Sequence, residues 1–223
     1  MGRLGRNRTA RTASSTVSPR APLGAAARTT MNMLSDVTLH GTHASLVPLG
    51  RAHAAALRAA AGDLHELWYT SVPAPDGVEA EIERRLALHA EGRMRHFAVL
   101  DAGGTPVGMT SYCNVEPGTP RLEIGYTWYA RSVQRTPLNT ECKLLLLTRA
   151  FEDLECLAVE FRTSIFNRPS RRAIERIGAK LDGVLRSHTR HQDGSLRDTC
   201  VYSVTAAEWP AVRRNLEFAL GAR

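Results

Sequence analysis

The strongest helical pattern in the chain covers residues 137–154. Leu144, Leu147, Phe151 and Leu154 recur at intervals of three and four residues, which places them on one side of an α-helix. The preceding segment, residues 122–129, alternates apolar and other side chains, as expected for a β-strand. A strand followed by a long amphipathic helix is therefore the best-defined unit of the chain.

The same criteria predict a series of shorter elements in the remainder of the chain. We expect further helices over residues 51–61, 78–91, 168–177 and 206–220, and further strands over residues 37–40, 45–49, 96–100, 107–115, 158–165, 181–190 and 197–204. Hairpins come first, and strand–helix–strand crossovers follow late in the chain. This order predicts an α/β fold with a mixed sheet and helices on both faces.

Residues 1–30 have a different composition from the rest of the chain. They contain six arginines, no lysine, no acidic residue and almost no large apolar side chain. Such a segment buries too little surface to offset its ordering entropy, so we predict a disordered basic tail over residues 1–33 and a single domain over 34–223. The tail resembles a transit peptide or a basic arm for nucleic acid, but we favour a start codon assigned too far upstream, with translation beginning at Met31 or Met33.

Charge and composition narrow the classes of protein. The 223 residues carry a net charge of +7, but residues 31–223 hold 23 basic and 22 acidic residues, which argues against a broad nucleic-acid-binding face. No run of 18 apolar residues occurs, so no transmembrane helix or membrane partner is expected. The four cysteines lack CxxC spacing, which indicates neither a zinc site nor a disulfide framework and fits a cytoplasmic protein.

The joint between the strand and the long helix could bind an anion. Thr136 can cap the helix and Pro137 suits its first position, so the free N–H groups of the first turn face outward. Arg135 adds a positive charge, and Asn139 and Thr140 add neutral donors. These features predict a phosphate or pyrophosphate pocket, although an ordinary capped helix would share them.

A second group of polar residues begins the helix predicted over 168–177. Asn167 is a natural N-cap, and Ser170, Arg171 and Arg172 follow within the first turn or just after it. These arginines could contact phosphates, or they could form the solvated side of a short helix.

Together these segments resemble the Gcn5-related N-acetyltransferase (GNAT) family, and within it the RimJ/RimL-like branch of ribosomal-protein alanine acetyltransferases. The resemblance spans about residues 37–220 and is carried by four segments in order: EIGYTW at 123–128, QRTPLNTECKLLLLTRAFEDL at 134–154, NRPSRRAIERIGA at 167–179 and RDTCVYSVTAAEWP at 197–210. One departure concerns the phosphate loop, where Pro137 and Asn139 stand at positions that are glycine in the family. Glycine lets the backbone approach a pyrophosphate closely, and proline removes one donor.

The resemblance implies a mostly antiparallel twisted sheet in which two parallel strands, 122–129 and 158–165, splay apart into a V. The pantetheine arm of acetyl-CoA would pair with the first strand, and the pyrophosphate would lie on the loop 134–140. A bulge near Thr127–Tyr129 would direct a backbone N–H toward the thioester oxygen. No metal is implied, and the residues implied to contact acetyl-CoA are Trp128, Tyr129, Gln134, Arg135, Thr136, Leu138, Asn139, Thr140, Asn167 and Arg171.

The implied activity is direct attack of a primary amine on the acetyl thioester in a ternary complex. Glu123 is the candidate base, although it could instead pair with Arg121 or Arg162. Many relatives carry a tyrosine as proton donor where this chain has Ile174, and Ser170 is the candidate substitute.

The acceptor is predicted to be a protein N-terminus, a peptide or a small amine, and the chain a monomer or homodimer. Trp68, Tyr69 and Tyr112 could line its site or pack in the core, and His188 and His191 could border it. Two other functions stay open: an acyl-CoA-binding module without catalytic activity, and a nucleic-acid-binding protein that uses the tail.

Overall fold

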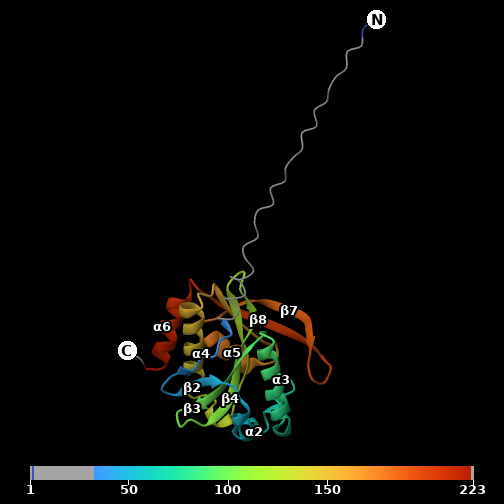
Figure 1. Cartoon of the computed structure of the whole chain (residues 1–223), viewed down its shortest axis with the longest axis vertical. Coiled ribbons are helices and arrows are strands. Elements are labelled where there is room, and N and C mark those ends of the chain that lie inside the picture. Colours follow the sequence, from blue (N-terminus) through green and yellow to red (C-terminus); the bar gives the residue numbers. More distant parts are fainter. Residues whose placement is uncertain (1, 3–32, 222–223) are drawn as a thin grey trace.

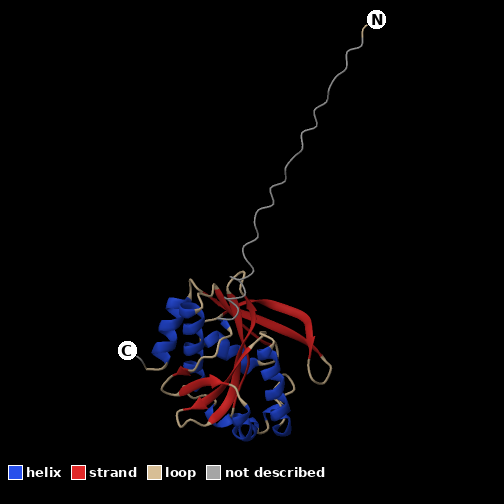
Figure 2. Ribbon diagram, viewed as in Figure 1, coloured by secondary structure: helices blue, strands red, loops and turns tan. Residues whose placement is uncertain are grey.

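A computed structural model describes residue 2 and residues 33–221 (Figures 1 and 2). The predicted basic tail lies outside these residues except for Gly2 and Met33, and Met33 is buried in the main core. The helices are α2 (Ala54–Ala61), α3 (Val78–Ala90), α4 (Leu138–Thr148), α5 (Arg168–Arg176) and α6 (Trp209–Ala219). The strands are β1 (Leu39–His40), β2 (Ala44–Pro48), β3 (Arg95–Asp101), β4 (Pro106–Glu116), β5 (Arg121–Tyr129), β6 (Ala158–Ser164), β7 (Lys180–Arg190) and β8 (Leu196–Thr205).

The eight strands form one sheet in the order β1-β2-β3-β4-β5-β6-β8-β7. Only β5 and β6 are parallel, so the predicted mixed and mostly antiparallel sheet is confirmed. Side chains of α4, α5 and α6 pack into one core cluster, and those of α2 and α3 pack into a second cluster. These helices cover opposite faces of the sheet, as Figures 1 and 2 show.

The parallel pairing of β5 and β6 is short. It joins Arg121–Glu123 to Ala158–Glu160, and beyond these three residues the two strands separate into the expected V. On the other edge of β5, Ser111 pairs with Gly125 and Met109 pairs with Trp128. Two residues, Tyr126 and Thr127, thus oppose one residue of β4 and form a β-bulge, in which the backbone of Tyr126 is left-handed with φ 53°. The bulge was predicted near Thr127–Tyr129 and begins one residue earlier.

The helix predicted over 137–154 is divided into two parts. Regular α-helix ends at Thr148, and the next turn, Arg149–Asp153, is a π-helix. The Leu154 N–H donates to the Arg149 carbonyl, five residues back, which widens the last turn. Leu147 and Leu154 remain buried, as the helical pattern predicts.

One carboxylate of α4 holds the start of the sheet. Glu141 accepts hydrogen bonds from the backbone N–H groups of Thr42, His43 and Ala44, at 2.9, 2.5 and 2.7 Å. A methyl group on Gly41 would overlap this carboxylate, so glycine is required there for steric reasons. Glu141 therefore holds the β1–β2 hairpin against α4, the helix that follows β5.

We expect Glu141→Ala to lower the free energy of unfolding by about 3 kcal/mol, because it removes three charge-assisted hydrogen bonds and leaves their donors unsatisfied. Urea denaturation followed by circular dichroism measures this change. Glu91→Ala is the control, since Glu91 is exposed and pairs only with the exposed Arg93 among the described residues. Equal losses in the two variants would contradict the assigned role of Glu141.

Candidate active site

The V presents a polar network on the face of the sheet that α2 and α3 cover. Glu123 is only 6 % exposed, and its Oε2 accepts a hydrogen bond from the Asn114 amide at 2.7 Å and lies 3.5 Å from Arg162 Nε. Its register partner across the V is Glu160, which pairs with Arg121 and, at 2.8 Å, with Arg162. Two arginines were considered as partners of Glu123. Arg162 contacts Glu123, whereas Arg121 pairs with Glu160.

Burial raises the pKa of Glu123, while Arg162 and the Asn114 hydrogen bond act in the opposite direction. A carboxylate with a raised pKa holds a proton more firmly once it has accepted it. Glu123 is thus a stronger base than an ordinary glutamate.

The bulge in β5 is supported by a buried arginine from α3. Arg85 bonds to Glu81 at 2.7 Å, and its guanidinium lies 3.3 Å from Ser111 Oγ and 3.4 Å from the Tyr126 carbonyl oxygen. On the opposite face, the hydroxyl groups of Thr110 and Thr127 lie 2.7 Å apart. Contacts from both faces thus fix the distorted backbone at the point where the V is open.

The N-terminus of α4 opens at the mouth of the V. The Gln134 amide donates to the Tyr129 carbonyl at 3.0 Å, and the Thr136 hydroxyl accepts from Leu138 N–H at 3.4 Å. The helix begins at Leu138, one residue later than predicted. Proline lacks a backbone N–H, but at position 137 an N–H would have no acceptor within the helix, so Pro137 costs the helix no hydrogen bond. The N–H groups of Asn139 and Thr140, in the first turn, have no carbonyl partner within the helix.

Two arginines flank this helix end. Arg135 is exposed, and its backbone is left-handed with φ 62°. Arg176, from the end of α5, donates to Thr140 Oγ1 at 3.2 Å. The sequence pattern assigned no role to Arg176, because only the fold brings the end of α5 beside the start of α4.

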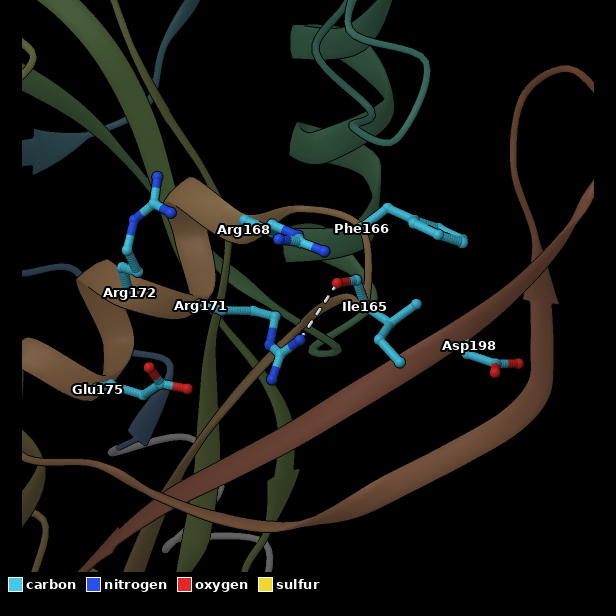
Figure 3. Close-up of a pocket in the computed structure, with 7 residues that line it drawn as sticks. All are labelled: Ile165, Phe166, Arg168, Arg171, Arg172, Glu175 and Asp198. Carbon is cyan, nitrogen blue, oxygen red and sulfur yellow. Dashed lines mark hydrogen bonds between the residues drawn. The ribbon is translucent and has the colours of Figure 1, made fainter.

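The start of α5 is organised as predicted at its cap. Asn167 accepts a hydrogen bond from the backbone N–H of Ser170 at 3.1 Å. Arg171 donates to Tyr202 Oη at 3.0 Å and to the Ile165 carbonyl at 3.4 Å, so its guanidinium is held against β8 and the loop after β6. It borders an open cavity of about 510 Å³ with Arg168 and Phe166, while Arg172 points away from Arg171 (Figure 3).

Three of the residues implied to contact acetyl-CoA are largely within the protein interior. Leu138 and Trp128 are buried, each in a different core cluster, and Tyr129 packs against the main core. Trp128 Nε1 is buried without a hydrogen-bond partner among the described residues, and the Tyr129 hydroxyl lies beside the Cys142 thiol.

Aromatic side chains gather near the turn of the β7–β8 hairpin. The ring of Trp68 lies 5.7 Å from Tyr69, 5.4 Å from Phe166 and 4.9 Å from His191. Trp68 and Phe166 are about half exposed. Of the other candidates for the acceptor site, Tyr112 is a core residue bonded to the Leu146 carbonyl, and His188 contacts Thr199.

The described residues contain no group of three or more His, Cys, Asp or Glu side chains placed to hold a metal ion. Within residues 33–221, no helix has the length and apolar character needed to cross a membrane.

Comparisons with known proteins agree with this geometry. Residues 44–180 match the family model described as an acetyltransferase (GNAT) domain. YdaF of Bacillus subtilis, which carries the provisional name of a ribosomal N-acetyltransferase, is 33 % identical over 106 residues, or 48 % of this chain. This alignment spans 57 % of the length of YdaF.

Two solved structures illustrate the structural likeness. A GCN5-related N-acetyltransferase from Brucella melitensis is 29 % identical, with a TM-score of 0.75 over 82 % of this chain and 85 % of its own. Mycobacterium smegmatis RimJ, solved in complex with CoA-disulfide, is 24 % identical, with a TM-score of 0.69 over 84 % of this chain and 94 % of its own.

The chain therefore belongs to the GNAT family of acetyltransferases, and the resemblance noted in the sequence is confirmed. GNAT enzymes are N-acetyltransferases that use acetyl-CoA and acetylate amine acceptors. The roles of individual residues at the V remain predictions.

We expect Arg135→Ala to weaken binding of coenzyme A by about 1–2 kcal/mol, since a charged hydrogen bond to phosphate would be lost. Titration calorimetry measures the affinity for coenzyme A and for pantetheine, which lacks the phosphates and should be insensitive to the change. Arg93→Ala, on an exposed arginine outside the V, is the matched control. Unchanged affinity of Arg135→Ala for coenzyme A would show that Arg135 does not contact phosphate.

Proposed function

We propose that the protein transfers the acetyl group of acetyl-CoA to the amino group of a protein N-terminus. The observation that carries this proposal is the V between β5 and β6, with the buried Glu123 carboxylate at its apex and the free N-terminus of α4 at its mouth.

The residues around the V suit acetyl-CoA as a substrate. The first-turn N–H groups of Asn139 and Thr140, with the charges of Arg135 and Arg176, suit a pyrophosphate. Beyond Glu123, the edge of β5 that faces β6 has no strand partner, so its backbone can bond to the amides of a pantetheine arm. The bulge at Tyr126 and Thr127 would supply a backbone N–H to stabilise the negative charge on the thioester oxygen.

The acceptor amine must lose a proton before it attacks, because an amino group is mostly protonated near neutral pH. Glu123 accepts this proton, directly or through water. Holding the amine beside the thioester supplies a further share of the rate acceleration.

Two observations support a protein N-terminus as acceptor. The relative YdaF has a name that refers to ribosomal acetylation. In addition, Trp68 and Phe166 expose aromatic surface beside the hairpin turn, which can bind the apolar side chains of a peptide.

The second candidate is an acyl-CoA-binding module without catalytic activity. It is favoured by Pro137 and Asn139 in the phosphate loop and by the buried, apolar Ile174 at the position of the family's tyrosine. Thiol release from acetyl-CoA with panels of amines and N-terminal peptides distinguishes the two, because such a module binds the thioester without turnover.

We expect Glu123→Gln to reduce turnover about 10²-fold while the affinity for coenzyme A stays near normal, because glutamine cannot accept the proton. Since burial raises the pKa of Glu123, the parent should lose activity as the pH falls through a value above that of an ordinary glutamate. This low-pH limb should disappear in the variant. Steady-state kinetics across a pH range provide the measurement.

Glu160→Gln is the matched comparison, because it removes the neighbouring carboxylate of the same network. It should leave the low-pH limb in place. If Glu123→Gln loses activity only in proportion to a loss of thermal stability, Glu123 is a structural partner of Arg162 and not the base.

A further inference from the structure

Lys143 lies at the floor of the V on the face that α4 covers. Its Nζ is 3.4 Å from Thr127 Oγ1, on the bulge of β5, and 5.6 Å from the ring centroid of Phe161, which follows the last paired residue of β6. The side chain thus reaches from α4 to both arms of the V. Lys143 is one of only two lysines in the chain, which has 27 arginines.

This amino group is buried and lacks an opposite charge. Lys143 is 6 % exposed, and no carboxylate of the described residues forms an ion pair with Nζ. One long hydrogen bond and one aromatic ring are weak compensation for removing an ammonium group from water. A group of this kind is expected where a ligand with negative charge will lie beside it.

The surroundings of Lys143 are electrically neutral. Cys142 is the titratable neighbour whose charge acts on Lys143, and Cys142 in turn contacts Tyr129 of β5. Burial raises the pKa of the Cys142 thiol to about 12 and that of the Tyr129 hydroxyl well above its usual value. From β6 it meets the uncharged Phe161. Arg176 of α5 contacts Thr140, three residues before Lys143 on α4, and burial lowers the pKa of Lys143 to about 8.

Lys143 and Glu123 approach the V from opposite faces. Glu123, Arg162 and Asn114 form the network on the α3 side, whereas Thr127 and Phe161 contact Lys143 on the α4 side. An acceptor amine beside Glu123 would therefore attack the thioester from one side, while Lys143 lies on the other side.

We infer that Lys143 is a catalytic residue whose ammonium group stabilises the negative charge on the sulfur of coenzyme A as it leaves. This inference rests on the proposed acetyl transfer, in which the thioester carbon lies beside the bulge and is bonded to that sulfur. When the tetrahedral intermediate collapses, the C–S bond breaks and its electron pair stays on sulfur. The adjacent Nζ ammonium group stabilises this thiolate, and the sulfur takes a proton from solvent as coenzyme A departs.

The protons balance over the cycle. The proton lost by the acceptor nitrogen goes to Glu123 or to water, the departing thiolate takes one proton from solvent, and Lys143 stays protonated throughout. With a pKa near 8, Lys143 carries a positive charge at lower pH and can stabilise a thiolate there. Neither Ile174, at the position of the family's tyrosine, nor the hydroxyl of Ser170 carries a positive charge that could replace it.

The first test is the titration of the thiol of bound coenzyme A, followed by thiolate absorbance after subtraction of the protein alone. In the parent, an adjacent ammonium group should hold the pKa of the bound thiol well below its value in water. Lys143→Met, which keeps the length but removes the charge, should abolish this effect, and Lys143→Arg should retain it. Lys180→Met, on the exposed second lysine, is the matched control and should behave as the parent.

The second test is turnover as a function of pH. Lys143→Met should reduce turnover about 10²-fold, and Lys143→Arg, which stays protonated, should remove the loss of activity that the parent shows as the pH rises through about 8. Calorimetric affinity for coenzyme A and a melting curve for each variant separate catalysis from binding and folding.

Three results would overturn the inference: a bound thiol that titrates alike in the parent and Lys143→Met, a high-pH limb that is unchanged in Lys143→Arg, or a parent that binds no coenzyme A. If the parent lowers the thiol pKa through Lys143 but acetylates no amine, the proposed function fails while the contact between Lys143 and sulfur is supported.

Discussion

The early end of the parallel pairing between β5 and β6 is the constraint on which the rest of the site depends. Three residue pairs hold the strands together, and beyond Glu123 and Glu160 each strand leaves one edge of its backbone without a strand partner. Backbone N–H and C=O groups without partners cost free energy inside a protein, which favours closing the gap between the strands. The gap stays open because neighbouring side chains hold both strands in place. Arg85 contacts the bulge from α3, and Lys143 bridges both arms from α4.

The two faces of the V have different electrostatic character. Carboxylates and arginines alternate on the α3 face, where Glu123 and Glu160 share Arg162. On the α4 face a single ammonium group lies among apolar and hydroxyl side chains. Proton acceptance by a carboxylate and stabilisation of a thiolate by an ammonium group need such different surroundings, because burial shifts the pKa values of the two groups in opposite directions.

Local patterns in the sequence predicted the elements that frame the V. The helical spacing of apolar residues gave the position of α4, alternation gave β5, and Asn167 marked the start of α5. The splay of the strands came from the family resemblance, since a short register of parallel pairing has no local signature. The π-helical turn at Arg149–Asp153 was not predicted, because the same apolar spacing is compatible with a regular helix.

The residues that the sequence did not single out act over long separations along the chain. Glu141 bonds to backbone groups almost a hundred residues earlier, and Arg176 reaches Thr140 from a different helix. Lys143 lies within an amphipathic pattern, where a lysine is normally assigned to the solvent side. Only the fold shows that this position faces the opening between two strands.

The phosphate loop shows how a departure from the family pattern can be accommodated. Because α4 begins at Leu138, Pro137 removes an N–H that would have no partner within the helix, and Thr136 occupies the next donor. Fewer backbone donors are then left for a pyrophosphate than a glycine-rich loop would offer, while Arg135 and Arg176 bring two formal charges to the same helix end. Attraction of phosphate would therefore depend more on exposed side-chain charge than on fixed backbone dipoles, and exposed charge is the component that dissolved salt screens most strongly.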